Sequence, residues 1–245
     1  MRFVLEPSEL SSLLKKVLIY KSKSLLEYVN VRFEPEGVSV RDVTAGTFAV
    51  MAEFSKQHFL EYECEGEGEV VVFPSDLIDL VKLFRGESVT VETDGEALTL
   101  TDGERTIRRH LMEPVEQEFK LKVADTNYGI VLERMLESDV RVLVDSSELT
   151  MPIAAQTYTF FVEGGDLKVK FEYGDMYDVT LKLPIISKDS LSDGFRASFH
   201  GPSLLPMLEN LNGEVWLLIS GEALNVSETT ETYKLSYALA SVEEV

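Results

Sequence analysis

A repeated stretch constrains the fold of this chain more than any other feature of its sequence. Residues 74–111 and 202–239 both open on Pro-Ser, continue through an apolar run at helical spacing, and pass into alternating apolar and polar residues. Both also contain Gly-Glu-Ala-Leu, at 95–98 and at 221–224. The copies are offset by 202 − 74 = 128 positions in a chain of 245 residues. Two copies are too few for a solenoid, so the repeat predicts two similar domains.

The two halves share one predicted order of elements. Helices are expected from Pro7, over 74–85, from Ser147 and over 202–211, with alternating strands between them and a polar loop over 187–193. Hairpin turns between the strands indicate antiparallel sheets, and helices on one face of such sheets make an α+β fold. The predicted domains are 1–113 and 140–245, joined by a connector over 114–139.

Charge, hydropathy and cysteine content indicate the cellular compartment and the kinds of partner that this protein is expected to have. The net charge of −20 usually argues against nucleic acid, although the distribution of charge decides more than its sum. No apolar run approaches the roughly 18 residues of a membrane-spanning helix. The single cysteine, Cys64, cannot form an internal disulfide. We therefore expect a cytoplasmic protein that does not bind a membrane.

No pattern in the sequence predicts a catalytic or metal site. His58, His110 and His200 lack a ligand partner at metal-binding spacing. Gly66 and Gly68 lie among glutamates, which repel a phosphate. The sequence contains neither a phosphate-binding loop nor a nucleophile elbow. We therefore expect that the protein is not an enzyme and uses no cofactor or metal.

Three short motifs resemble a known family. Residues 37–41 read Gly-Val-Ser-Val-Arg, residues 59–64 read Phe-Leu-Glu-Tyr-Glu-Cys, and residues 239–244 read Leu-Ala-Ser-Val-Glu-Glu. They resemble the Gly-Ile-Ser-Leu-Arg, Phe-x-x-Tyr-Glu-Cys and Leu-Ala-Pro-Arg-Val-Glu-Glu segments of the proliferating cell nuclear antigen (PCNA) family of sliding clamps, particularly its archaeal members. The order of elements is similar over nearly the whole chain, but Ser241 stands where the family has proline.

The resemblance implies two sliding-clamp domains per chain, with antiparallel sheets and two helices each, assembling into a ring of three chains. It implies a processivity factor for DNA replication and repair that encircles duplex DNA, associates with the nucleoid and tethers enzymes by short peptides. The implied peptide partners are DNA polymerase, a clamp loader, a flap nuclease and a ligase. Two alternatives stay open: a homotrimer or a heterotrimer of paralogous subunits, and an acidic clamp-fold scaffold that does not itself encircle DNA.

The same resemblance implies a DNA-binding surface on helices that line the hole. In the first half the cations are Lys15, Lys16, Lys21, Lys23, Lys82 and Arg85, with Lys15 and Lys16 placed opposite the apolar stripe of their helix. The two second-half helices contain no Lys or Arg, and each carries an interior proline, Pro152 or Pro206. The positive lining is therefore expected to be lopsided.

Two further surfaces follow from the resemblance. The subunit interface is expected to pair two strand edges, which comprise Thr106, Ile107, Arg108, Arg109, His110, Leu111 and Met112 on one side and Asp178, Val179, Thr180, Leu181, Lys182 and Leu183 on the other. The partner-peptide groove is expected to comprise Val43, Thr47, Phe48, Leu121, Val123, Ala238, Leu239 and Ala240. The other interpretation of the groove residues is that they cap the local core.

Overall fold

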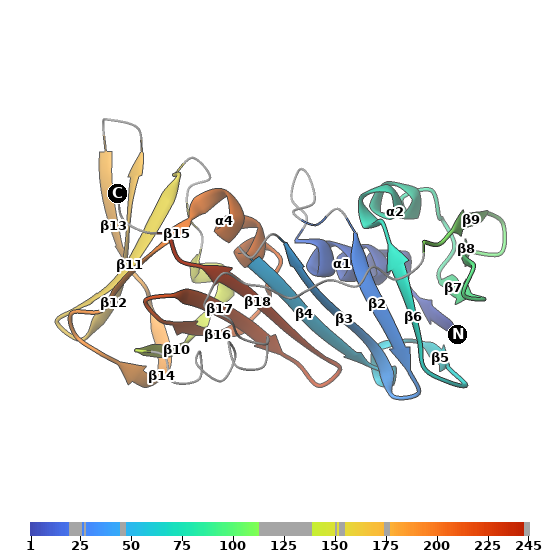
Figure 1. Cartoon of the computed structure of the whole chain (residues 1–245), viewed down its shortest axis with the longest axis horizontal. Coiled ribbons are helices and arrows are strands. Elements are labelled where there is room, and N and C mark those ends of the chain that lie inside the picture. Colours follow the sequence, from blue (N-terminus) through green and yellow to red (C-terminus); the bar gives the residue numbers. More distant parts are fainter. Residues whose placement is uncertain are drawn as a thin grey trace. The chain divides into compact units, whose positions relative to one another are not determined.

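The computed structural model describes residues 1–19, 26, 28–44, 48–112, 139–149, 151, 155–173 and 177–242 (Figure 1). The chain forms two compact units. The first comprises Met1–Asp42, Val50–Gln117 and Thr229–Leu235, and the second comprises Val43–Ala49, Glu118–Glu228 and Ser236–Val245. Strands that cross a unit boundary contribute residues to both units.

In its described residues the first unit has two helices and two antiparallel sheets. The helices are α1 (Pro7–Leu18) and α2 (Pro74–Val81), which pack against each other, and a 3-10 turn covers Lys56–His58. One sheet has the order β5-β1-β7-β8-β9, and the other has the order β18-β4-β3-β2-β6 within this unit. The strands are β1 (Arg2–Leu5), β2 (Val29–Glu34), β3 (Gly37–Thr44), β4 (Phe48–Ser55), β5 (Glu61–Glu63), β6 (Gly68–Val72), β7 (Val89–Thr93), β8 (Ala97–Thr101), β9 (Thr106–His110) and β18 (Tyr233–Ala240).

The second unit is built in the same way. One sheet has the order β14-β10-β16-β17-β18-β4 within this unit, and the other has the order β13-β12-β11-β15. Helix α4 (Gly201–Glu209) and a 3-10 turn over Ser146–Leu149 accompany them. The strands are β10 (Val140–Asp145), β11 (Thr157–Glu163), β12 (Asp166–Tyr173), β13 (Tyr177–Lys182), β14 (Ile185–Leu191), β15 (Arg196–His200), β16 (Glu214–Ile219) and β17 (Ala223–Thr229).

The structure confirms the α+β class and the antiparallel pairing, and it corrects four of the predicted elements. The segment predicted as a polar loop over 187–193 is mostly strand β14, which pairs with β10 although most of its side chains are exposed. Its polar sequence fits a terminal strand, because such a strand has little core to cover. Helices α2 and α4 end at Val81 and Glu209, earlier than predicted. The described part of the helix expected from Ser147 is a single 3-10 turn.

Alternation of side chains builds the core of each unit. In β10 the buried residues are Val140, Val142 and Val144, and the residues between them are half-buried. The turn between β2 and β3 requires Gly37, since a Cβ there would lie 2.0 Å from the carbonyl oxygen of Phe54. Among the described residues, no helix is long and apolar enough to cross a membrane.

Candidate functional site

Two terminal strands, β9 and β13, have regular open edges. In the described part of the chain β9 pairs on one side only, with β8, in an unbroken register from Ala97↔His110 to Thr101↔Thr106. Strand β13 pairs on one side with β12, in an unbroken register from Lys168↔Lys182 to Tyr173↔Tyr177. The opposite edge of a regular extended strand offers backbone N–H and C=O groups to another strand.

The other four terminal strands are less available. Strand β5 has three residues, Glu61–Glu63, and two of them are acidic. Val71 of β6 forms a bridge with Met112, and the carbonyl of Ser198 in β15 accepts a hydrogen bond from the backbone N–H of Val242 at 2.8 Å. The pairing of β14 with β10 is interrupted by two register shifts. Shortness, charge, coverage and bulges all discourage further pairing, so β9 and β13 are the edges best suited to assembly.

The side chains of β9 tie this edge to its own unit. Arg109 donates to the carbonyl oxygen of Phe73 at 3.0 Å, and its guanidinium lies 5.2 Å from the Phe73 ring centroid. Arg108 pairs with Asp94 at 3.5 Å. The pKa of Asp94 is lowered, first by the backbone N–H of Ala97 and further by Arg108. The last residue of the predicted interface segment, Met112, is 55% exposed.

The side chains around β13 are paired in a similar way. Lys182 lies 2.8 Å from Asp166, and this hydrogen bond is the main cause that lowers the pKa of Asp166. Asp178 lies 3.8 Å from Lys170, and Leu181 is partly exposed. Leu183, the last residue of the predicted interface segment, lies just after β13 and is 3% exposed. Its N–H donates to the carbonyl of Leu167 at 2.9 Å.

The predicted DNA-facing lysines of α1 lie in different environments. Lys15 is exposed. Lys16 is only 6% exposed, and its ammonium lies 5.0 Å from the ring centroid of Tyr233. Position 16 lies away from the apolar stripe, but its side chain is not exposed to solvent. The contact with Tyr233 of β18 is one that local helical spacing cannot reveal.

The end of α2 holds the other described cations. Lys82 is exposed and pairs with Asp79 at 2.6 Å. Arg85 is exposed, and its backbone N–H donates to Asp102 at 2.9 Å. Asp102 also accepts backbone N–H groups of Arg105, Gly86 and Glu104. The N–H donors of Arg85 and Arg105 are the leading causes that lower the pKa of Asp102 to about 2.

Sequence reasoning missed Asp102 as the residue that positions the backbone of Arg85. The signal was present, since Asp102-Gly103 is a turn dipeptide in which Asp bonds backbone groups two and three residues later. Lys21 and Lys23 lie outside the described residues. Helix α4 contains Pro206 and no Lys or Arg. Of the predicted cations, those that the described parts of α1 and α2 and their ends expose are Lys15, Lys82 and Arg85.

The described residues of the predicted peptide groove belong to the second unit. Phe48 is 4% exposed, and Ala238 and Leu239 are also buried. Ala240 is half-buried, and Val43 lies in β3. Thr47, Leu121 and Val123 lie outside the described residues. The predicted walls Phe48 and Leu239 are thus buried within the chain itself, whereas Ala240 is half-buried and so more accessible to a partner.

Ser241, which stands where the resembling family motif has proline, makes two hydrogen bonds that hold the tail. Its backbone N–H donates to the carbonyl of Glu222 and its hydroxyl donates to the carbonyl of Gly221, each at 2.9 Å. Proline has no N–H and no hydroxyl, so it cannot make either bond. The substitution therefore adds two bonds between the tail and the β16–β17 turn.

The Cys64 thiol and the Tyr62 hydroxyl make hydrogen bonds to backbone carbonyls. The thiol of Cys64 lies 2.9 Å from the carbonyl oxygen of Gly66, and the Tyr62 hydroxyl donates to the carbonyls of Glu34 and Gly37 at 2.6 and 2.7 Å. Burial is the main cause that raises the pKa of Tyr62. Within the described ranges, no group of three or more His, Cys, Asp or Glu residues is placed to hold a metal ion.

No protein-family model and no curated protein sequence matches the chain. Solved structures do match it. The PCNA of A. fulgidus, solved with the C-terminal region of FEN-1 bound, has a TM-score of 0.80 at 14% identity and covers 100% of this chain and 99% of its own. The PCNA2–PCNA3 complex of Sulfolobus tokodaii has a TM-score of 0.76 at 16% identity, with 100% of both chains covered.

A third match supports the same conclusion. The PCNA of Thermococcus kodakaraensis has a TM-score of 0.77 at 15% identity and covers 98% of this chain and 99% of its own. Full-length similarity to several clamps, at an identity too low to transfer residue roles, establishes the architecture. The chain therefore has the two-domain fold of the PCNA sliding clamps, in a sequence that has diverged far from theirs.

Proposed function

We propose that this chain is a non-catalytic subunit of a DNA sliding clamp, which encircles duplex DNA and tethers replication and repair enzymes. The observation that carries the proposal is the pair of regular open edges, β9 and β13, in a chain with the PCNA fold. The two edges differ in sequence, so their pairing is head to tail, and head-to-tail contacts close into rings when the rotation allows. The domains of the clamp would be 1–113 and 140–245, with 114–139 as the connector.

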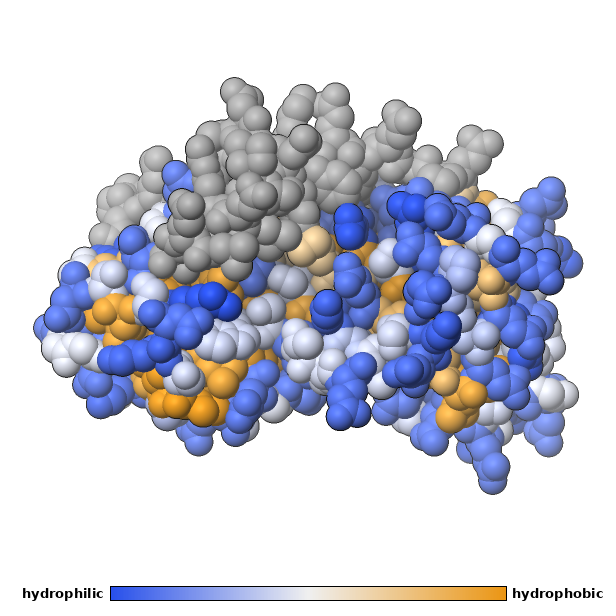
Figure 2. All heavy atoms as spheres, turned by 90° about the horizontal axis from the view of Figure 1, so that it is seen from below, coloured by the Kyte–Doolittle hydropathy of each residue, from blue (hydrophilic) through white to orange (hydrophobic). Residues whose placement is uncertain are grey.

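Contact with DNA in this proposal is electrostatic and independent of base sequence. Lys15, Lys82 and Arg85 are the exposed described cations that would meet phosphates, with Lys21 and Lys23 as further candidates. Among the coloured residues of Figure 2, hydrophilic ones predominate on the right, and the more extended hydrophobic area lies on the left. A ring reconciles a net charge of −20 with DNA, because the positive groups need only line the hole.

Partner proteins are proposed from the matched structures. The A. fulgidus clamp binds the C-terminal region of FEN-1, and the Sulfolobus tokodaii structure is a complex of two different clamp subunits. We infer that this chain likewise captures short peptides of polymerase, clamp loader, nuclease and ligase, and acts in the cytoplasm at the nucleoid. The absence of Lys and Arg from α4 favours a heterotrimer, whose other subunits supply positive charge.

The decisive experiment compares retention on closed and open DNA. The chain, with paralogous subunits where the source has them, is loaded onto a nicked circular plasmid and followed through gel filtration before and after cutting at one site. A ring that encircles DNA stays on the circle, is lost from the cut plasmid, and is retained again when bulky blocks close both ends. An Ile107→Pro variant, which disrupts β9, serves as the matched control.

Equal loss from circular and cut DNA by an assembled ring would contradict encirclement. That result, together with retained peptide binding, would identify an acidic clamp-fold scaffold that does not encircle DNA.

A further inference from the structure

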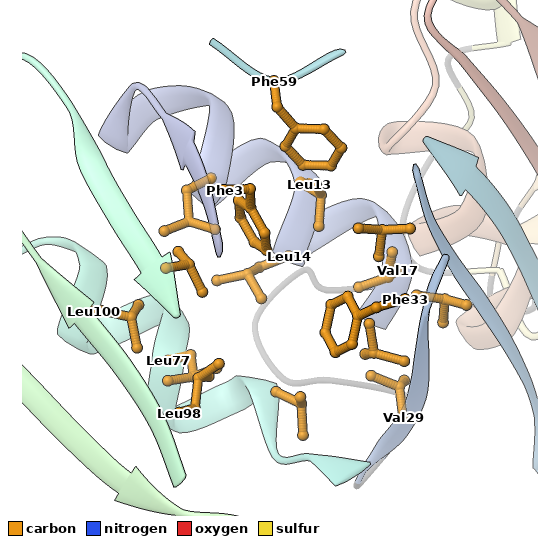
Figure 3. A pocket seen from close by; sticks show the side chains of 16 residues that line it. Phe3, Leu13, Leu14, Val17, Val29, Phe33, Phe59, Leu77, Leu98 and Leu100 are labelled. Carbon is orange, nitrogen blue, oxygen red and sulfur yellow. The ribbon is translucent and has the colours of Figure 1, made fainter. Parts of the chain in front are cut away.

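The core of the first unit contains a cavity of about 60 Å³ with walls made only of Phe, Leu and Val side chains (Figure 3). Three layers supply the walls. Leu14 and Val17 come from α1, Phe3 and Leu100 come from the β5-β1-β7-β8-β9 sheet, and Phe33 comes from the sheet that contains β2. Figure 3 shows these side chains directed toward a common space between the helix and the strands.

The chemistry of the walls excludes water as a well-bound occupant. A buried water molecule needs two to four polar partners, and none of the lining side chains carries a polar atom. An empty void also forfeits the dispersion contacts that a close-packed interior provides. An apolar atom placed in the void restores these contacts without leaving a hydrogen bond unmade.

We propose that this cavity is a binding site for one small apolar ligand of the size of a xenon atom. An engineered apolar cavity of about 150 Å³ binds benzene or xenon. The present cavity has less than half of that volume, so it admits a single large atom and excludes an aromatic ring. This site is independent of the edges, cations and groove residues of the proposed clamp.

A ligand in this cavity is expected to stabilise the first unit, because the cavity lies in the core of that unit. Most of the lining side chains are buried, whereas Leu13 and Val31 are half-buried, and the cavity is not fully enclosed. Its lining residues come from both described helices and both sheets of the first unit. Because the ligand binds the folded chain and not the unfolded one, it raises the stability of this unit as its concentration rises.

Xenon provides a direct test. Crystals of the full chain are pressurised with xenon, and the anomalous scattering of xenon locates the site. A single peak is expected among Phe3, Leu14, Phe33 and Leu100. In the Val17→Ile variant, which adds one methyl group to the wall, the peak occupancy should fall by at least half. In Val242→Ile, the same change at the partly exposed tail, the occupancy should match that of the wild type.

Two results would overturn the proposal. The first is a wild-type crystal with no xenon peak in the cavity at saturating pressure, and the second is full occupancy in Val17→Ile. If Val17→Ile does not fold, Val29→Ile makes the same addition from β2. Soaking with benzene tests the size limit, because occupancy by benzene equal to that by xenon would contradict the assignment to a single atom.

Discussion

Lys15 and Lys16 are adjacent in sequence, yet their different burial predicts opposite phenotypes. The logarithm of the DNA-binding constant falls linearly with the logarithm of the salt concentration. Lys15→Ala should make this slope shallower by up to about 0.9, because it removes one phosphate contact. Lys16→Ala should leave that slope unchanged. It should instead lower the free energy of unfolding by about 1 kcal/mol, since it removes the ammonium over Tyr233 and the packing of its stem.

The measurements are salt titrations of DNA binding and chemical unfolding of both variants, with Lys82→Ala as a second exposed lysine. A slope change in Lys16→Ala without a loss of stability would show that the ammonium faces DNA after all.

Ala240 is the groove residue at which a substitution best tests peptide capture. Ala240→Asp should weaken binding of a clamp-interacting peptide at least tenfold, or about 1.4 kcal/mol, because the peptide would cover an unpaired carboxylate. Phe48→Ala, by contrast, removes a buried side chain and should lower stability by about 3–5 kcal/mol. Isothermal titration with the peptide measures the first effect and thermal unfolding the second.

Ala240→Ser, which is small and uncharged, is the matched control for the aspartate variant. A folded Ala240→Asp protein that binds the peptide as tightly as the wild type does would place the groove elsewhere.

Among the secondary-structure elements, β9 and β13 carry the prediction about assembly. Ile107→Pro and Leu181→Pro should each shift the ring toward single chains, because each removes the N–H that bonds the terminal strand to β8 or β12 and so distorts the open edge beside it. The same substitution in bulged β14, Ser187→Pro, should leave the assembled mass unchanged. Analytical ultracentrifugation over a range of concentrations measures the mass, and circular dichroism checks that each variant is folded.

Two outcomes would argue against these edges. Variants at Ile107 and Leu181 that keep the wild-type mass at low concentration would show that assembly uses another surface. A loss of assembly in Ser187→Pro alone would assign the interface to β14.

For a ring of identical chains, which is the alternative to the proposed heterotrimer, the net charge of −20 per chain predicts two opposite responses to salt. Association of chains of the same sign is opposed by repulsion, which salt screens over about 10 Å at 0.1 M. Raising the salt concentration should therefore strengthen association of identical chains while it weakens binding to DNA. Sedimentation and DNA binding measured across the same salt series test both effects, and a mass that falls with salt would mean that ion pairs at the interface outweigh the repulsion.

The sequence by itself determined the class of fold. The repeated stretch gave the two-part organisation, and alternation gave strands such as β10, where every second valine is buried. Proline at the first turn marked where α1, α2 and α4 begin. Alternation also predicted strands within 106–112 and 178–183, where β9 and β13 lie, whereas the expectation that these strands form open edges came from the family resemblance. The strands and the helix starts depend on residues a few positions apart, so they can be read from the chain alone.

Tertiary structure decided which of these residues are accessible. Lys16 is buried, and its ammonium lies against the ring of Tyr233, which is distant in the sequence. The polar segment after β13 became strand β14 because β10 supplies its hydrogen-bond partners. The cavity among Phe3, Leu14 and Phe33 arises because three layers meet there without filling the space. Periodicity and propensity are local, whereas burial, pairing and voids depend on which distant segments come together, and only the folded chain specifies those contacts.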